Sequence, residues 1–123
     1  MHYSEYNGPW NWPNFTPQEI ACRHCGELVV DEESLDALQL LRDACGKPIQ
    51  LTSAHRCEDH NRNVGGTPNS QHLKLAFDCV CPKADQPLFI AAAEAAGFTG
   101  IGRYPSRGFV HLDCGPKRRW TGK

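Results

Sequence analysis

The chain has 123 residues, which is enough for one domain around a single hydrophobic core. Its 13 Lys and Arg residues and 14 Asp and Glu residues give a formal net charge of -1, so it lacks the basic excess of a general nucleic-acid-binding protein. No apolar run reaches the roughly 18 residues of a membrane-spanning helix, and residues 1–8 lack the cationic start and apolar stretch of a secretory signal peptide. We therefore expect a protein made in the cytoplasm, with no nucleic-acid partner and no membrane insertion.

The start of the chain predicts an aromatic arm and a short helix. Residues 1–14 contain Tyr and Trp side chains interrupted by Pro and Gly, and we expect an irregular arm whose rings pack on a domain formed by residues 15–123. Thr16 can cap a helix, Pro17 suits the first helical position, and Glu19 stands three residues after the cap. Together these residues predict that a short helix begins here.

The rest of the chain predicts two longer helices and four strands. Apolar residues at helical spacing favour a helix from 32 to about 45, and an Ala-rich helix is expected over 85–96. Four segments favour strands, the last two as a hairpin: 49–53, 75–81, 98–104 and 108–113. Residues 54–71 read as a polar loop with one helical turn near His60, and residues 117–123 read as a basic tail that contains Trp120. We predict an α+β domain: a small, mostly antiparallel sheet with helices packed on one side.

Three side chains form a candidate set of metal ligands. His111 and Asp113 lie two residues apart on a predicted strand and so share a face, although a hydrogen-bonded core pair explains them equally well. His72 and Asp78 are six residues apart, and in an extended chain this even spacing puts both on one face. Two histidines and one carboxylate with an open fourth position are typical of catalytic zinc, so His72, Asp78 and His111 are the candidate ligands.

Five motifs follow one another over most of the chain, at 52–56, 58–61, 64–72, 76–78 and 108–116. In this order the sequence resembles the M15 peptidases, the zinc D-Ala-D-Ala carboxypeptidase group of peptidoglycan peptidases, and within them the small bacterial and phage members. The resemblance covers roughly residues 15–116 and implies a hedgehog/DD-peptidase-like fold.

The resemblance also implies roles for individual residues. By this likeness His72, Asp78 and His111 are the ligands of one catalytic Zn²⁺, Arg56 binds a substrate carboxylate, and Ser70 contacts the substrate. A guanidinium suits such a carboxylate because it can donate two parallel hydrogen bonds. A surface salt bridge is the alternative for Arg56.

The chain departs from the family pattern in ways that affect the expected chemistry. The segment between His72 and Asp78 is one residue shorter than usual and lacks a Gly, so its local path must differ. Many members place an acidic base where this chain has Gly108. Asp113 then becomes the best candidate for the general base, and orientation of the His111 ring is the alternative role.

Residues 58–60 are secondary candidates for the site. Glu58 and Asp59 are weaker alternatives for the base, because the turn that carries them is expected to expose them. His60 is expected either to bind the substrate or to hold its own loop.

The seven cysteines offer a further possibility for metal binding. An odd number argues against a complete set of disulfides. The hypothesis of a thiol-rich structural or redox protein is supported only by the number of cysteines. Cys22 and Cys25 have the spacing of half a zinc site, and Cys79 and Cys81 could supply the other half. We expect the first pair only to order a turn and the second to face away from Asp78, so a second, structural zinc site is not expected.

The leading hypothesis is a zinc metallopeptidase that hydrolyses peptide bonds in peptidoglycan stem peptides by metal-activated water. D-Ala-D-Ala carboxypeptidases and L-Ala-D-Glu endopeptidases both occur among the proteins it resembles. The rival hypothesis is a non-catalytic zinc-binding module that recognises cell-wall or protein ligands, as in the signalling domain of hedgehog proteins. We expect a monomer, and the absence of a signal peptide favours a phage or prophage lysin that acts on the cell wall once released.

Overall fold

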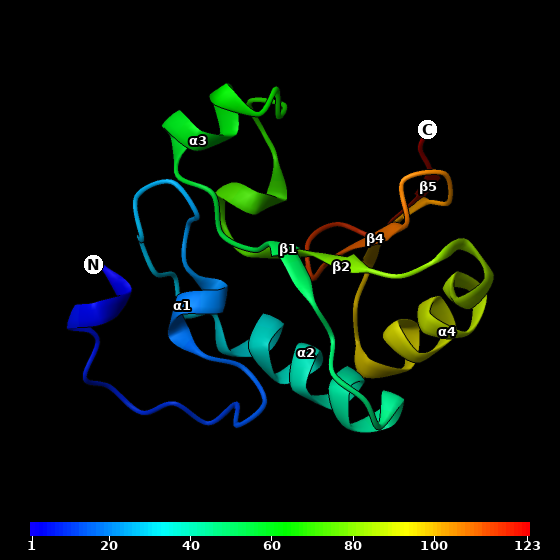
Figure 1. Ribbon diagram of the computed structural model, residues 1–123, viewed down its shortest axis with the longest axis horizontal. Helices are drawn as coiled ribbons and strands as arrows, with labels where there is room; N and C mark the ends of the chain where they lie inside the picture. Colours follow the sequence, from blue (N-terminus) through cyan, green and yellow to red (C-terminus); the bar gives the residue numbers. More distant parts are fainter.

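A five-stranded sheet with the strand order β1-β2-β4-β3-β5 forms the centre of the computed structural model, which describes residues 1–123 (Figure 1). The strands are β1 (Leu51–Ser53), β2 (Ala76–Val80), β3 (Gly100–Tyr104), β4 (Phe109–Asp113) and β5 (Arg118–Thr121). All neighbouring strands are antiparallel except β3 and β5, which are parallel. The predicted α+β class and the mostly antiparallel sheet are confirmed.

Four α-helices and three 3-10 helices accompany the sheet. The α-helices are α1 (Pro17–Ile20), α2 (Glu32–Cys45), α3 (Glu58–Asn63) and α4 (Gln86–Ala96), and the 3-10 helices are η1 (Tyr3–Glu5), η2 (Gln71–Leu73) and η3 (Lys83–Asp85). The capping box predicted for α1 is present, since the Glu19 backbone N–H donates to Thr16 Oγ1 at 3.2 Å and Glu19 Oε1 accepts from the Thr16 N–H at 2.9 Å. None of the helices combines the length and the apolar character needed to cross a membrane.

The two faces of the sheet differ in character. Phe77, Leu112 and Ile101 are aligned across β2, β4 and β3 and are buried in the main core. The helices contribute other buried side chains to this core: Leu35, Leu38 and Leu41 from α2 and Ala93 from α4. Because side chains alternate along a strand, the residues between these core positions point to the opposite face. That opposite face carries the polar residues of the candidate site.

The aromatic arm packs against the domain through its rings. Trp12 is only 2% exposed and belongs to the main core, and its indole N–H donates to Asp36 Oδ1 of α2 at 2.9 Å. Tyr3, Tyr6 and Trp10 are partly buried against the same core. In Figure 1 the arm runs in blue past α1 towards α2.

The last strand is the main feature that the sequence did not predict. Residues 117–123 were expected only as a basic tail, but Arg118–Thr121 forms β5 and extends the sheet beyond β3. Its parallel pairing places Arg118 beside Gly100 and Trp120 beside Gly102 of β3, so that both side chains reach residues of β4 on the polar face.

Candidate metal centre and substrate cleft

One row of residues crosses the sheet on its polar face. The register of neighbouring strands pairs Ser53 with Asp78, Asp78 with His111, His111 with Gly102, and Gly102 with Trp120. The antiparallel pairing of β2 with β4 therefore brings Asp78 and His111 side by side, although they are far apart in the sequence.

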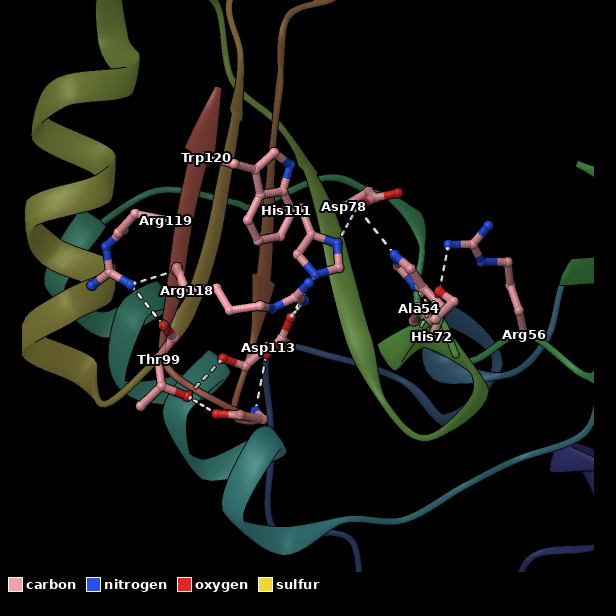
Figure 2. A network of polar contacts seen from close by, with 12 residues as sticks. Ala54, Arg56, His72, Asp78, Thr99, His111, Asp113, Arg118, Arg119 and Trp120 are labelled. Carbon is pink, nitrogen blue, oxygen red and sulfur yellow. Dashed lines mark hydrogen bonds and ion pairs between the residues drawn. The ribbon is translucent and has the colours of Figure 1, made fainter. Parts of the chain in front are cut away.

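His72 joins this row from a loop and completes a group of three possible metal ligands. The distances from Asp78 Oδ1 to His72 Nε2 and to His111 Nδ1 are both 3.2 Å. The ligand atoms of the three residues all lie within 4.8 Å of one another. Figure 2 shows Asp78 between the two imidazole rings, with Trp120 beside His111 and Arg56 on the side of His72.

The path from His72 to Asp78 differs from the sequence expectation. The even spacing predicts that both residues lie on one face of an extended chain, but His72 lies in the 3-10 helix η2 and β2 begins only at Ala76. This prediction is wrong, because Lys74 leaves the helix with φ -95° and ψ -103° and turns the chain into the strand. The bend brings the two side chains together despite the short segment.

Hydrogen bonds at the far side of each ring fix the two imidazole tautomers. His72 Nδ1 lies 2.6 Å from the Ala54 carbonyl oxygen, and His111 Nε2 lies 2.7 Å from Asp113 Oδ2. Both oxygens only accept hydrogen bonds, so each of these nitrogens carries the proton. His72 Nε2 and His111 Nδ1 are then available to a metal ion, as in many sites where an outer acceptor orients a histidine ligand.

Asp113 is held in a closed pocket behind His111. Its side chain is 0% exposed and lies 3.2 Å from Arg118 Nη2, and its Oδ1 accepts from the Gly115 N–H at 2.9 Å. A Cβ placed on Gly100 would lie 2.5 Å from the Asp113 carboxyl carbon, so the carboxylate occupies space that only a glycine leaves open.

The charges of the site are set by these contacts. Burial raises the pKa of the Asp78 carboxyl, but the His111 and His72 rings outweigh it and hold the pKa well below its ordinary value. Burial also raises the pKa of Asp113, and His111, the Gly115 N–H and Arg118 again bring it below the ordinary value. Burial lowers the pKa of His111, but the Asp113 and Asp78 carboxylates raise it above the ordinary value. Both carboxylates are thus ionised.

The ligand set fits a single small cation. Two imidazole nitrogens and one carboxylate oxygen are the donors that zinc uses in catalytic sites with three protein ligands. The Asp78 side chain is 19% exposed, so one side of the group is open.

The open side of the group faces a cleft of about 440 Å³. Its lining contains Arg56, Arg107 and Arg118, against a single carboxylate, that of Asp78. The Arg56 guanidinium donates to Ser70 Oγ at 3.4 Å, while its buried Nε has no partner. Burial lowers the pKa of Arg56 and the nearby Asp78 charge raises it, leaving it below its ordinary value. The cleft therefore presents a cationic lining to an anionic ligand.

Two aromatic residues of the cleft were not predicted from the sequence. The Trp120 ring lies 5.2 Å from the His111 ring, and its indole N–H donates to the Tyr104 hydroxyl at 2.8 Å. A Cβ on Gly102 would lie 2.7 Å from Trp120 Nε1, so this glycine makes room for the indole. The glycines at alternate positions of β3 were the available sequence signal, because they leave the polar face of that strand without side chains.

The secondary candidates of residues 58–60 lie elsewhere. His60 belongs to α3, stacks on His24 with ring centroids 5.8 Å apart, and does not line the cleft. Asp59 pairs with Arg62 on the exposed surface of α3, and Glu58 is exposed as well. The structure thus brings together His72, Asp78, His111, Asp113, Arg56 and Ser70, but not these three.

Comparison with known proteins identifies relatives of this chain. The family model described as Peptidase M15 matches residues 13–113. The peptidoglycan L,D-endopeptidase MepK of Escherichia coli K12 is 34% identical over 99 residues, which cover 74% of this chain and 54% of the relative. The probable peptidoglycan L,D-endopeptidase MepK of Haemophilus influenzae is 33% identical over 79 residues, covering 63% of this chain and 41% of the relative.

The chain thus spans about half the length of the curated relatives it matches. Four of the five sequence motifs lie within the matched residues 13–113, and the match ends inside the fifth, at 108–116. The chain belongs to the M15 peptidase family.

Proposed function

We propose that this protein is a zinc-dependent peptidase that hydrolyses peptide bonds in peptidoglycan stem peptides. The observation that carries the proposal is the group formed by His72, Asp78 and His111, which offers a catalytic zinc ligand set and opens into a cationic cleft. Stem peptides carry free carboxylates, which suit the arginines of this cleft.

We propose that the bond cleaved in the stem peptide joins an L-residue to a D-residue inside the peptide. The relatives from Escherichia coli and Haemophilus influenzae are named L,D-endopeptidases, which supports this choice over D-Ala-D-Ala carboxypeptidase activity. Arg56 is the proposed anchor for a substrate carboxylate, because its Nε is buried without a partner and its guanidinium can form a planar pair. Ser70, hydrogen-bonded to Arg56, would hold that guanidinium and contact the substrate.

The roles of the chain's own residues follow from their contacts. His72, Asp78 and His111 would hold the zinc ion through Nε2, a carboxylate oxygen and Nδ1. Bound zinc supplies a Lewis acid and lowers the pKa of a coordinated water. Trp120, packed beside His111, would cover one side of the centre and restrict the access of bulk water.

For Asp113 we favour the orienting role over the role of general base. Its carboxylate has no exposed surface and accepts hydrogen bonds from His111, Gly115 and Arg118, so a substrate or water has no approach to it. It would keep the His111 proton on Nε2 and thereby direct Nδ1 to the metal.

A specific observation keeps the non-catalytic zinc module as the second candidate. The carboxylates near the centre are Asp78, a proposed ligand, and the enclosed Asp113, so neither is a free carboxylate base in the cleft. Such a module would bind stem peptides through Arg56 without cutting them.

Purified peptidoglycan fragments distinguish the two functions. The zinc-loaded protein is incubated with them, with and without a chelator, and the products are analysed by mass spectrometry. We expect new peptide ends that disappear with the chelator and with His111→Ala. Fragment binding with no new ends under any zinc concentration would favour the module and contradict the peptidase.

A further inference from the structure

Three cysteines from two distant parts of the chain lie close together. The sulfurs of Cys22, Cys25 and Cys57 all lie within 4.8 Å of one another. None belongs to the His72, Asp78 and His111 centre, and none forms a disulfide. Spacing along the sequence pointed to Cys79 and Cys81 as partners for the first pair, but both are buried in the main core on β2 and just after it.

The turn from Cys22 to Gly26 has a backbone suited to two metal ligands. Gly26 has φ +76°, a left-handed conformation that glycine adopts readily, and its N–H donates to the Cys22 carbonyl at 2.9 Å. The turn directs both sulfurs of the C-x-x-C pair to one side. This spacing is typical of the thiolate pairs in structural zinc sites.

Backbone N–H groups point at two of the sulfurs. The Cys57 N–H lies 3.4 Å from Cys22 Sγ, and the His60 N–H lies 3.4 Å from Cys57 Sγ. Such donors stabilise negative charge on sulfur, and hydrogen bonds to ionised acceptors are stronger than those to neutral ones. Two of the three sulfurs thus lie where a backbone donor can stabilise a thiolate, whereas Cys79 is enclosed by the apolar core.

The position of the cluster also differs from that of ordinary core thiols. Cys22 is buried, Cys57 is half-buried and Cys25 is exposed, so the group opens to solvent on one side. A metal ion could enter there without disruption of the fold. His24 lies at the edge of the group, with its Nδ1 3.7 Å from Cys57 Sγ.

We propose that Cys22, Cys25 and Cys57 form a second metal site, which binds Zn²⁺ as a structural ion. Soft thiolates select zinc over magnesium and calcium, and structural zinc sites commonly combine three cysteines with one histidine. His24, with its Nδ1 3.7 Å from Cys57 Sγ, is the candidate for the fourth position. Each thiol gives up its proton to solvent when the ion binds, so no oxidant or reductant is needed.

The ion would tie the substrate-binding segment to the body of the domain. Cys57 directly follows Arg56, whose backbone N–H donates to the His72 carbonyl at 2.7 Å. The turn at Cys22 follows α1, whose Ile20 is fully buried. A metal bond between these two segments would fix the start of the loop that carries Ser70 and His72.

Cobalt substitution tests the site in the wild-type chain of 123 residues. Thiolate-bound Co²⁺ absorbs strongly in the near ultraviolet through sulfur-to-metal charge transfer, whereas the His72, Asp78 and His111 centre contains no sulfur. We expect the reduced protein to show this absorption and to bind one zinc more per chain than the catalytic centre accounts for. Neither readout depends on hydrolysis, so the failure of this site and the failure of the proposed function are distinguishable.

Variants identify the ligands. Cys25→Ser changes an exposed side chain, and it and Cys57→Ser should each abolish the charge-transfer absorption and lower the melting temperature of the zinc-loaded protein. Cys45→Ser, at a half-buried cysteine outside the cluster, is the matched control and should leave the absorption unchanged. His72→Ala should retain it as well. Circular dichroism checks that each variant is folded.

Three results would overturn the proposal. One is a folded, reduced wild-type protein that takes up Co²⁺ without the charge-transfer absorption. Another is an absorption that persists in both Cys25→Ser and Cys57→Ser. The third is a disulfide between two of the three cysteines, detected by mass in protein purified with zinc and without reductant.

Discussion

Replacement of Gly100 by alanine should weaken zinc binding without a change in any ligand. The new Cβ would lie 2.5 Å from the Asp113 carboxyl carbon, well inside ordinary van der Waals contact. Asp113 cannot rotate away freely, because His111, Gly115 and Arg118 hold its carboxylate and its side chain has no exposed surface. The carboxylate must move, and its 2.7 Å contact with His111 Nε2 is lost or lengthened.

The size of the effect follows from the role of that contact. Loss of the outer partner of a histidine ligand costs about 10- to 100-fold in metal affinity, which corresponds to about 1.4 to 2.8 kcal/mol. The strained, poorly paired carboxylate should also lower the free energy of unfolding by about 1–3 kcal/mol. Competition with a chromophoric chelator measures the zinc affinity, and thermal unfolding of the metal-free protein measures the stability.

Gly102→Ala provides the matched comparison on the same strand. Its Cβ would meet the Trp120 ring, at 2.7 Å from Nε1, rather than a partner of a metal ligand. We expect this variant to shift the fluorescence of the indole and to retain zinc more tightly than Gly100→Ala. Zinc affinity in Gly100→Ala equal to that of the wild type would refute the orienting role of Asp113.

The remaining predictions concern the ligands, the outer carboxylate, the arginine and pH. His72→Ala or His111→Ala should remove the zinc of the catalytic centre, and elemental analysis that finds this zinc unchanged in both would make the ligand assignment wrong. Asp113→Asn should weaken zinc about 10- to 100-fold and retain most of the turnover at saturating zinc; a fall of about 10²- to 10⁴-fold there would instead assign it the role of base. Arg56→Lys keeps the charge but loses the planar fork, so KM for carboxylate-bearing stem peptides should rise at constant zinc content, and unaltered kinetics would leave Arg56 with a structural role. The Asp113 and Asp78 carboxylates outweigh burial and raise the pKa of His111, so protons compete with the metal for Nδ1 at a higher pH than they would at a histidine of ordinary pKa. Acidification should therefore release the zinc above the ordinary histidine range. Zinc retained below that range would contradict this prediction.

Local signals in the sequence were sufficient to predict most of the secondary structure. The α2 helix spans Glu32–Cys45, as expected from its apolar spacing, and Gly46 ends it with φ 66°. The hairpin of β3 and β4 was also predicted, because alternation and turn residues act over a few neighbouring positions. The helical turn expected near His60 is present as α3.

Features that depend on long-range pairing were not predictable in the same way. The strand β5 contains Arg118, Arg119 and Trp120, which read as a basic tail, and its pairing with β3 comes from tertiary packing. The approach of Cys57 to Cys22 and Cys25 likewise requires the fold, since no spacing rule connects residues so far apart.

The candidate metal site lies between these two cases. The residue types and the family resemblance named His72, Asp78 and His111, and the structure brings their ligand atoms together. The even spacing from His72 to Asp78 does not explain why the two side chains meet, because η2 and the bend at Lys74 determine that geometry. The enclosure of Asp113 could not be read from the sequence either, since it depends on Gly100 of a neighbouring strand and Arg118 of the next.

A crystal of the zinc-loaded protein, measured on both sides of the zinc absorption edge, tests the catalytic centre most directly. We predict an anomalous peak bonded to His72 Nε2, His111 Nδ1 and an Asp78 carboxylate oxygen, with zinc–nitrogen distances of about 2.0–2.1 Å. No peak among these three residues, or an ion bound through His111 Nε2, would contradict the zinc centre on which the proposed peptidase rests.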